Sequence, residues 1–325
     1  TETHLDLPAW NDVSVKIDGI VIRRDGTVDN PLDGEEDWNK IDRYGAHVGV
    51  RWRPTATFEA LLDFDYSHDA STPYYVQLLD KTPTAPALAP LVQVQPNRAK
   101  RGDIGVPSQD SIGKTQGWAV RLNWSPMEDL EIRSISSYRR LKQSQYDNGI
   151  GAHAGVFVPN GRFARYSLAS LRQDQWSQEF QAIGDLGQFH YVGGLYYYHE
   201  AGDDDAWTPN TMQWNANGTA ATRLPTLEAG ASWAFPDRAS TAKADSYAAF
   251  GQVTWTPAML EERLHFTVGG RLTHDKKSGR LFKVNGANTN FTFDFEDDRF
   301  DPTVIVAYDA TDDVHLYGKW GTAYR

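Results

Sequence analysis

The stretch WTPAMLEERLHFTVGGRLTHD, residues 255–275, decides the fold class of this chain. After a Trp and a short charged turn, one parity of the run is apolar, at Leu264, Phe266, Val268 and Leu272. The other parity is polar, at His265, Thr267, Arg271 and Thr273. A period of two is typical of a β-strand with one apolar and one polar face. The stretch therefore predicts a hairpin whose two faces meet different surroundings.

The unit of strand, short turn and strand recurs along the chain. The repeats are rich in Pro, Asp, Gly or Thr at the turn, which favours β-hairpins. They lie at 48–69, 119–138, 178–200 and 304–320. One further strand is predicted within 13–26. The sequence thus predicts an all-β chain of about eleven strands.

Long polar connections alternate with these short turns. We predict them at 25–42, 70–116, 142–172, 201–244 and 276–298. In an antiparallel up-and-down sheet, alternate connections lie at opposite ends, so all short turns share one end. Loops of this length are rare in compact soluble domains, whereas transmembrane β-barrels combine short periplasmic turns with long extracellular loops. The pattern favours an antiparallel up-and-down transmembrane β-barrel over residues 1–325.

The amino-acid composition limits which partners and sites the chain can have. The 325 residues carry a net charge of -11, which argues against a nucleic-acid partner. No cysteine is present, so disulfides and thiolate metal sites are excluded. The mean hydropathy of -0.56 is that of a soluble chain. However, a membrane barrel hides its lipid face by alternation, so this value does not decide the compartment.

The predicted strands assign residues to two faces. Aromatic residues stand just before four short turns and predict a girdle at one membrane interface; they are Trp52, Trp124, Trp255 and Tyr308. Ionisable residues of the opposite parity are predicted to face a wet lumen; they are Arg51, Arg121, His265, Arg271 and Lys319. A closed barrel would satisfy every backbone polar group in hydrocarbon.

The long loops supply the candidate ligand contacts. Exposed aromatic rings can stack on sugars or siderophore rings, and the candidates are Tyr74, Tyr75, Phe157, Phe163, Trp207 and Trp214. Folding of the loops onto the barrel mouth would explain the same residues. Acidic runs at 34–37, 202–207 and 295–298 could bind calcium or bridge to lipopolysaccharide through divalent ions. Solvated acidic loops are the favoured alternative.

Catalytic motifs are not found in the sequence. Neither a G-x-S-x-G elbow nor an H-E-x-x-H pair is present. We therefore expect no enzyme activity and no resident cofactor, although a transported ligand can itself contain iron.

Several of these stretches resemble the middle barrel strands of TonB-dependent outer-membrane receptors. They are WSQEFQAIGDLGQFHYVGGLYYYHE, SYAAFGQVTWTPAMLEERLHFTVGGRLTHDKK and FDPTVIVAYDATDDVHLYGKWGTAYR. The earlier RRDGTVDNPLDGEEDWNKIDRYGAHVGVRWRPT is similar to a loop and strand pair nearer the start of such barrels. The resemblance covers nearly the whole chain and is weakest in the long loops.

The resemblance implies a place in the bacterial outer membrane and active uptake of a scarce solute, with ferric siderophores as the commonest class. It also implies a barrel of 22 strands and a plug through which the TonB complex acts. We expect this chain to be a barrel fragment without the plug and the C-terminal strands, in contact with lipid and lipopolysaccharide. The alternatives are a receptor for an oligosaccharide or another nutrient, a passive porin, and a soluble β-rich carbohydrate-binding protein.

Overall fold

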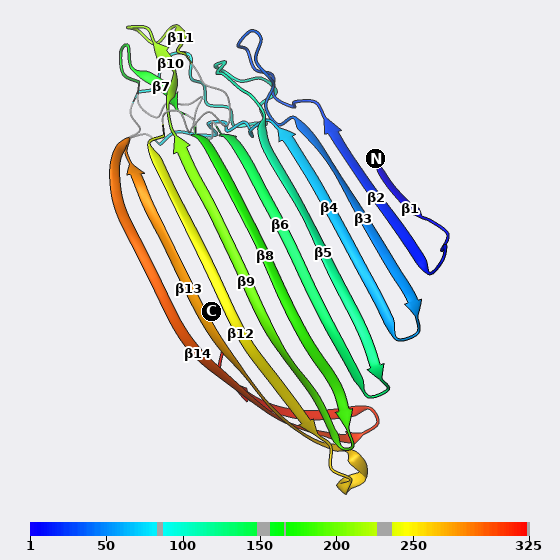
Figure 1. Cartoon of the computed structure of the whole chain (residues 1–325). Helices are drawn as coiled ribbons and strands as arrows, with labels where there is room; N and C mark the ends of the chain where they lie inside the picture. The colour runs from blue at the N-terminus through cyan, green and yellow to red at the C-terminus, as the bar shows by residue number, and fades with distance from the viewer. Residues whose placement is uncertain (83–86, 148–156, 166, 226–235, 324–325) are drawn as a thin grey trace.

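Twelve strands form one antiparallel sheet in the computed structural model, which describes residues 1–82, 87–147, 157–165, 167–225 and 236–323 (Figure 1). The sheet order is β1-β2-β3-β4-β5-β6-β8-β9-β12-β13-β14-β15, so each strand pairs with its neighbours along the main chain. This arrangement confirms the up-and-down topology. The strands are β1 (Glu2–Asp6), β2 (Val13–Arg24), β3 (Ile41–Thr55), β4 (Phe58–Ser71), β5 (Ser111–Met127), β6 (Leu130–Asp147), β8 (Ser167–Leu186), β9 (Phe189–Trp207), β12 (Arg238–Trp255), β13 (Leu264–Val284), β14 (Ala287–Thr311) and β15 (Val314–Gly321).

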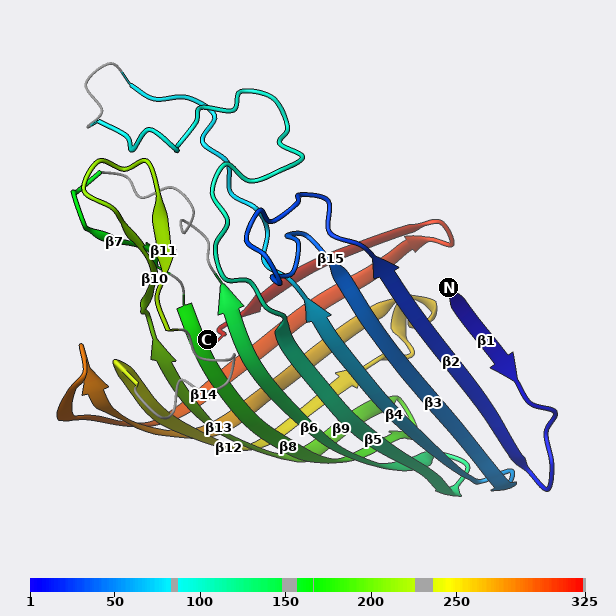
Figure 2. The ribbon, with the colours of Figure 1, turned by 90° about the horizontal axis from the view of Figure 1, so that it is seen from above.

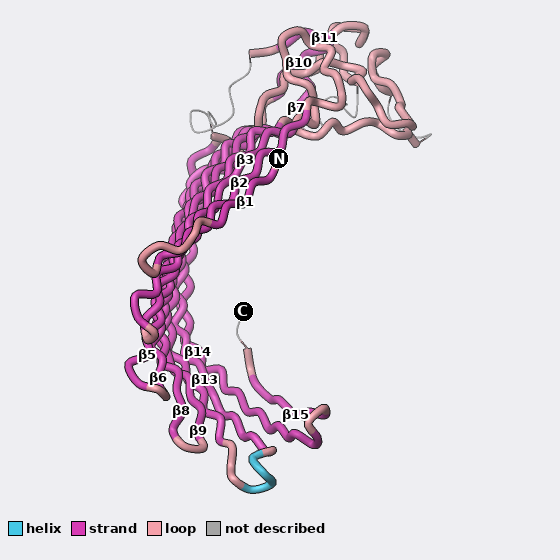
Figure 3. The backbone as a smooth tube through the Cα atoms, turned by 90° about the vertical axis from the view of Figure 1, so that its right-hand side faces the viewer, coloured by secondary structure: helices cyan, strands magenta, loops and turns pink. Residues whose placement is uncertain are grey.

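The sheet curves strongly and leaves one concave and one convex face (Figures 2 and 3). Its two edges are β1 and β15, each hydrogen-bonded to another strand on one side only. The predicted count of about eleven strands is therefore one too low. The missing strand is β1, which pairs with β2 through the tight turn at Asn11 and Asp12, both with positive φ.

Short turns gather at one end of the sheet and long connections at the other (Figure 1). The short-turn end includes a 3-10 helix, Met259–Glu262, between β12 and β13. Among the residues that the structure describes, no helix is long and apolar enough to cross a membrane.

The prediction of a long loop at 276–298 is wrong. This range belongs to β13 and β14, which continue as a hairpin to a tight turn at Asn285 and Gly286. Both turn residues have positive φ, at 49° and 76°, as a two-residue hairpin turn of type I′ requires. Alternating apolar residues on both sides of this Asn-Gly pair extend the sheet instead of leaving it.

The other four long connections are shortened by strands that run into them. β6 continues to Asp147, β9 continues to Trp207, and β12 begins at Arg238. Within these connections, a separate sheet forms in the order β11-β10-β7. Its strands are β7 (Arg162–Arg165), β10 (Asn210–Trp214) and β11 (Ala221–Arg223).

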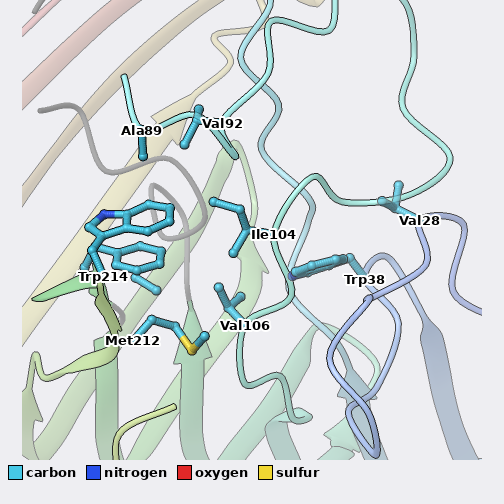
Figure 4. Packing of buried hydrophobic residues seen from close by; sticks show 10 residues of the cluster. Val28, Trp38, Ala89, Val92, Ile104, Val106, Met212 and Trp214 are labelled. Carbon is cyan, nitrogen blue, oxygen red and sulfur yellow. The ribbon is translucent and has the colours of Figure 1, made fainter. Parts of the chain in front are cut away.

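The largest buried apolar cluster among the described residues lies in the long connections and not on the curved sheet (Figure 4). We call the described parts of residues 25–40, 72–110, 157–165 and 208–225 the cap. Trp38 and Val106 are buried in it, and Phe163 stacks on Trp214 with 4.0 Å between the ring centroids. Trp38 sits against Gly102, where an added Cβ would approach its ring to 2.8 Å. The cap is thus a packed body at one end of the sheet.

The convex face of the curved sheet carries an apolar band between two rows of aromatic rings. The row near the short turns contains Trp52, Phe58, Trp124, Phe189, Trp255 and Tyr308. The row near the cap contains Tyr44, Tyr66, Trp118, Tyr138, Trp176, Tyr197 and Tyr247. On β3, Tyr44 and Trp52 of the two rows are eight residue steps apart, or about 26 Å at roughly 3.3 Å per step.

Candidate functional site: a polar concave face beneath the cap

The polar residues of the strands share the concave face. Directly opposed residues of antiparallel strands point to the same side, which places Arg51, Leu61 and Arg121 in one lateral row. Side chains on a concave face converge and cover one another. Accordingly, Thr267 on the polar row is 7% exposed, whereas its neighbour Val268 on the apolar row is 61% exposed.

All five residues predicted to face the lumen lie on this polar side. Continuous register connects them across the sheet; they are Arg51, Arg121, His265, Arg271 and Lys319. His265 lies between Thr256 and Asp309, with Nδ1 2.9 Å from the Thr256 hydroxyl and Nε2 3.1 Å from the carboxylate. Contact between these five residues and a solute stays a prediction.

Charged pairs line much of the concave face. Near β1, His47 lies 3.1 Å from both Asp18 and Asp63, and His4 lies 2.7 Å from the other oxygen of Asp18. Arg139 of β6 reaches over Gly117 of β5 to Asp65 of β4, at 2.7 Å. These networks are partly exposed, so they suit a hydrated surface more than a dry core.

A recess of about 500 Å³ surrounds Arg271. Its guanidinium lies 5.3 Å from the ring centroid of Tyr196 and 5.8 Å from that of Phe250, and Nε donates to the Thr273 hydroxyl at 3.1 Å. Gly194 leaves room for Phe250, because a Cβ there would approach the ring to 2.5 Å. Within the described residues, no carboxylate lies within ion-pair distance of Arg271. Asp275 and Asp301 also line the recess, and Asp301 is directly opposite Arg271. Because neither carboxylate is within ion-pair distance of the guanidinium, Arg271 can still receive an anionic group.

We expect Arg271→Leu to change solute passage while the barrel still folds. The lost ring and hydroxyl contacts contribute about 1 kcal/mol, whereas removal of the cation should weaken handling of an anionic solute by about fivefold or more. Uptake kinetics and the heat-modifiable folded fraction would measure the two effects. Arg271→Lys is the matched control, because it keeps the charge and loses the planar stacking group. A folding defect as large as that of a charge placed on the convex face would contradict this assignment.

A second recess, of about 370 Å³, lies where the concave face meets the cap. Arg43, Asp69 and Tyr74 line it, and Tyr74 is 72% exposed. Lys40 also lines it and lies 2.7 Å from Asp110 and 3.2 Å from Glu36. Burial works against the charged form of Lys40, but hydrogen bonds to these two carboxylates outweigh burial and raise its pKa. The recess therefore combines fixed charges with an accessible aromatic ring.

The six predicted ligand aromatics have different positions. Tyr74 alone among them is largely exposed and lines the mouth recess. Tyr75 packs on Trp38 at 4.9 Å between centroids and donates from its hydroxyl to Asp103. Trp207 packs against Tyr146 and Leu168 at the base of the cap.

For Phe163 and Trp214, the structure contradicts a role in ligand contact. Their side chains are 2% and 3% exposed and stack on each other inside the cap. Phe157 packs edge-on against Trp214 at 6.1 Å. The alternative interpretation, loop folding onto the mouth, accounts for these three rings, because the apolar surface of the connections is buried among their own side chains.

The acidic runs do not converge on a metal. Within the ranges that the structure describes, no group of three or more acidic or histidine side chains could hold a metal ion. Asp203, Asp204 and Asp205 lie in β9, where neighbouring side chains point to opposite faces. Run 295–298 likewise belongs to β14, and Glu35 of the first run pairs with Arg223 and accepts from the Ser108 N–H at 2.7 Å. Calcium binding at these runs has no support in this arrangement.

The four residues of the predicted girdle all lie on the convex face next to the short turns, which is the geometry that a girdle needs; they are Trp52, Trp124, Trp255 and Tyr308. Trp255 lies 5.7 Å from Phe266 and 6.4 Å from Phe189 between ring centroids, so the row is wider than predicted. The row near the cap was not predicted. The sequence does carry a signal for this row. On the same strand and with the same parity, a second aromatic residue lies six or eight positions from the aromatic residue at the turn, as Tyr44 does from Trp52 and Trp118 from Trp124.

Comparison with known proteins defines the class. The family model "TonB dependent receptor-like, beta-barrel" matches residues 51–325. The chain therefore belongs to the TonB-dependent receptor β-barrel family, whose members are transport receptors and not enzymes. No curated protein matches the sequence.

Three solved receptors illustrate the likeness. The ferric yersiniabactin uptake receptor FyuA from Yersinia pestis is 18% identical, with a TM-score of 0.67, over 98% of this chain and 43% of that chain. The ferric preacinetobactin receptor BauA from Acinetobacter baumannii is 15% identical, with a TM-score of 0.60, over 98% and 44%. The ferric-catecholate import receptor Fiu from E. coli K12 is 12% identical, with a TM-score of 0.62, over 98% and 51%. The chain thus spans about half of the length of these receptors or less. At identities this low, the likeness establishes the shared fold alone.

Proposed function

We propose that this chain forms part of the wall of an outer-membrane receptor that binds an iron complex, such as a ferric siderophore, and imports it with TonB-transmitted energy. The observation that carries the proposal is the division of one curved sheet into an apolar convex face and a charged concave face beneath a cap. The family match supports transport, and the ferric-siderophore receptors among the structural neighbours support the solute class.

The proposal places the convex face in the lipid of the bacterial outer membrane. Strands of membrane barrels tilt by about 40°, and their apolar band is about 25 Å tall between aromatic girdles. The 26 Å of strand between the two aromatic rows would then span about 20 Å of membrane. In hydrocarbon, the free backbone groups of β1 and β15 need partner strands, because each unpaired group is costly there.

Of the rival functions, a soluble carbohydrate-binding protein is contradicted by the structure. Such a protein would bury its apolar parity in a core, yet Leu195 and Val268 on the apolar parity are each 61% exposed. A passive porin and a receptor for an oligosaccharide share the same wall, so experiment must separate them.

The test uses the full-length gene product that carries this chain, produced in a Gram-negative host lacking its own siderophore receptors. Uptake of radioactive iron would be measured from a panel of ferric siderophores, with and without a functional TonB complex. We expect uptake of one complex that disappears without TonB. TonB-independent diffusion of small solutes would identify a porin, and TonB-dependent uptake of an oligosaccharide without iron uptake would overturn the solute class.

We expect Tyr74→Ala to weaken solute binding by about 2–10-fold, because a lost aromatic contact is worth about 0.5–1.5 kcal/mol. Titration of the purified receptor with the transported complex would measure the effect. Tyr74→Phe keeps the ring and should bind like the parent protein. Unchanged affinity of Tyr74→Ala would remove the mouth recess from the ligand site.

A further inference from the structure

Three cations stand side by side on the convex face, beyond the aromatic row near the cap. Lys114 of β5 is directly opposite Lys142 of β6, which is directly opposite Arg172 of β8. All three side chains are exposed, and within the described residues none has an ion-pair partner. We call Lys114, Lys142 and Arg172 the cationic row.

The cationic row keeps a constant distance from three aromatic rings. Lys114, Lys142 and Arg172 each lie four residues beyond Trp118, Tyr138 and Trp176 on the same strands. Four residues correspond to about 13 Å along a strand. Tyr138 pairs laterally with both Trp118 and Trp176, so the rings form a row parallel to the cations. If the rings mark the edge of the apolar layer, the cations lie at the level of lipid head groups, which long side chains reach easily.

The protein compensates the charge of the row only in part, because Asp203 of β9 is directly opposite Arg172 and the carboxylate of Asp174 attracts Lys142. Like charges placed directly opposite on neighbouring strands destabilise a sheet. Next to the row, Arg140 is neutralised by Asp174 at 2.5 Å. At the same end of the convex face on later strands, His199 lies 2.8 Å from Asp245 and Lys276 lies 3.6 Å from Glu296. Lys243 and Arg280 there have no ion-pair partner among the described residues, but the residues directly opposite them are uncharged, so they form no row of cations. Asp203 is thus the one carboxylate directly opposite these three cations, and the row keeps a net positive charge that an external anion can neutralise.

An apolar groove begins on the same strand as Arg172. It has a volume of about 670 Å³ and lies on the convex face among Phe180, Leu195, Ala249 and Leu272, below Tyr197 and Tyr247. The small side chain of Ala249 between larger neighbours opens it. The groove has the lining that a hydrocarbon chain requires, and β8 carries both Arg172 and Phe180.

We propose that the cationic row binds the phosphate groups of lipopolysaccharide in the outer leaflet, with acyl chains of the same lipid in the apolar groove. The proposal rests on the membrane orientation given under the proposed function. Direct pairing of phosphates with Lys and Arg replaces the bridging of acidic loops by divalent ions that the sequence suggested. A bisphosphorylated lipid fits because it supplies several negative charges above several acyl chains.

The test compares two triple variants of the full-length receptor, purified from outer membranes in mild detergent. Lys114→Gln, Lys142→Gln and Arg172→Gln together remove the row. Lys243→Gln, Lys276→Gln and Arg280→Gln together remove the same charge from the same face and end of β12 and β13. Lipopolysaccharide retained per receptor and the affinity for fluorescent lipopolysaccharide would be measured, together with competition by its dephosphorylated form and by inorganic phosphate.

We expect roughly fivefold weaker binding for each cation removed and roughly 100-fold for the row. The control triple should bind like the parent, and dephosphorylated lipid should compete poorly. Equal binding by both triples overturns the proposal, and so does full competition by inorganic phosphate at low millimolar concentration, which would indicate a site for soluble anions. If the row triple fails to assemble, Lys142→Gln alone provides the test, with Lys142→Arg as its control. This readout is independent of iron uptake, whereas failure of the parent receptor to insert into membranes would count against the orientation itself.

Discussion

Leu62→Arg should prevent most of the receptor from assembling in the membrane. Leu62 lies on the convex face of β4, midway between Phe58 and Tyr66 of the two aromatic rows, and its side chain is exposed. A cation at the bilayer midplane of a barrel costs about 2–4 kcal/mol. Since 1.4 kcal/mol is a factor of ten, this corresponds to about 30–1000-fold in the folding equilibrium. Heat-modifiable electrophoresis after refolding into lipid vesicles would measure the folded fraction.

The matched control is one residue away. Leu61→Arg introduces the same group on the same strand, but the side chain joins Arg51 and Arg121 in a lateral row of the concave face. Repulsion between exposed cations in water is screened and amounts to about 1 kcal/mol or less. Leu61→Arg should therefore assemble far better than Leu62→Arg. The reverse order, or equal yields, would mean that the two faces have been assigned to the wrong environments.

Trp214→Ala should unfold the cap without unfolding the wall. Trp214 is buried, stacks on Phe163 and packs edge-on against Phe157. Truncation of a buried Trp costs about 3–5 kcal/mol. In the part of the chain that the structure describes, no member of its apolar cluster belongs to the curved sheet, so the loss should be confined to the cap. Hydrogen exchange should rise sharply in 157–165 and 208–225 and stay unchanged in β8 and β9.

Two controls make this prediction specific. Trp214→Phe keeps a ring against Phe163 and should retain most of the protection of the cap. Tyr74→Ala removes an exposed ring from the same set of connections and should leave exchange in the cap unchanged. Increased exchange throughout the curved sheet after Trp214→Ala would show that cap and wall unfold together.

The alternation of apolar and polar residues in the sequence determined which side chains lie on each face of the curved sheet. In a strand, a period of two assigns every residue to a face, so the concave position of Arg271 and the convex position of Val268 could be predicted from residues 264–272 alone. The same alternation placed the Trp or Tyr before each short turn on the apolar face, so one aromatic row could be predicted from the sequence. The hairpin signal at Asn285 and Gly286 was also present in the sequence and predicts the turn between β13 and β14.

The cap and the recesses were decided by tertiary structure. Phe163, Trp214 and Trp38 come from different connections, and whether such rings stay exposed or pack together depends on contacts between segments that have no common period. The sequence therefore could not separate buried Trp214 from exposed Tyr74, although both are aromatic residues in long polar loops. The cationic row has the same origin, because Lys114, Lys142 and Arg172 become neighbours only through the register of β5, β6 and β8. Periodicity fixes the direction of a side chain along its own strand, whereas its neighbours across the sheet and in the cap are fixed by pairing and packing.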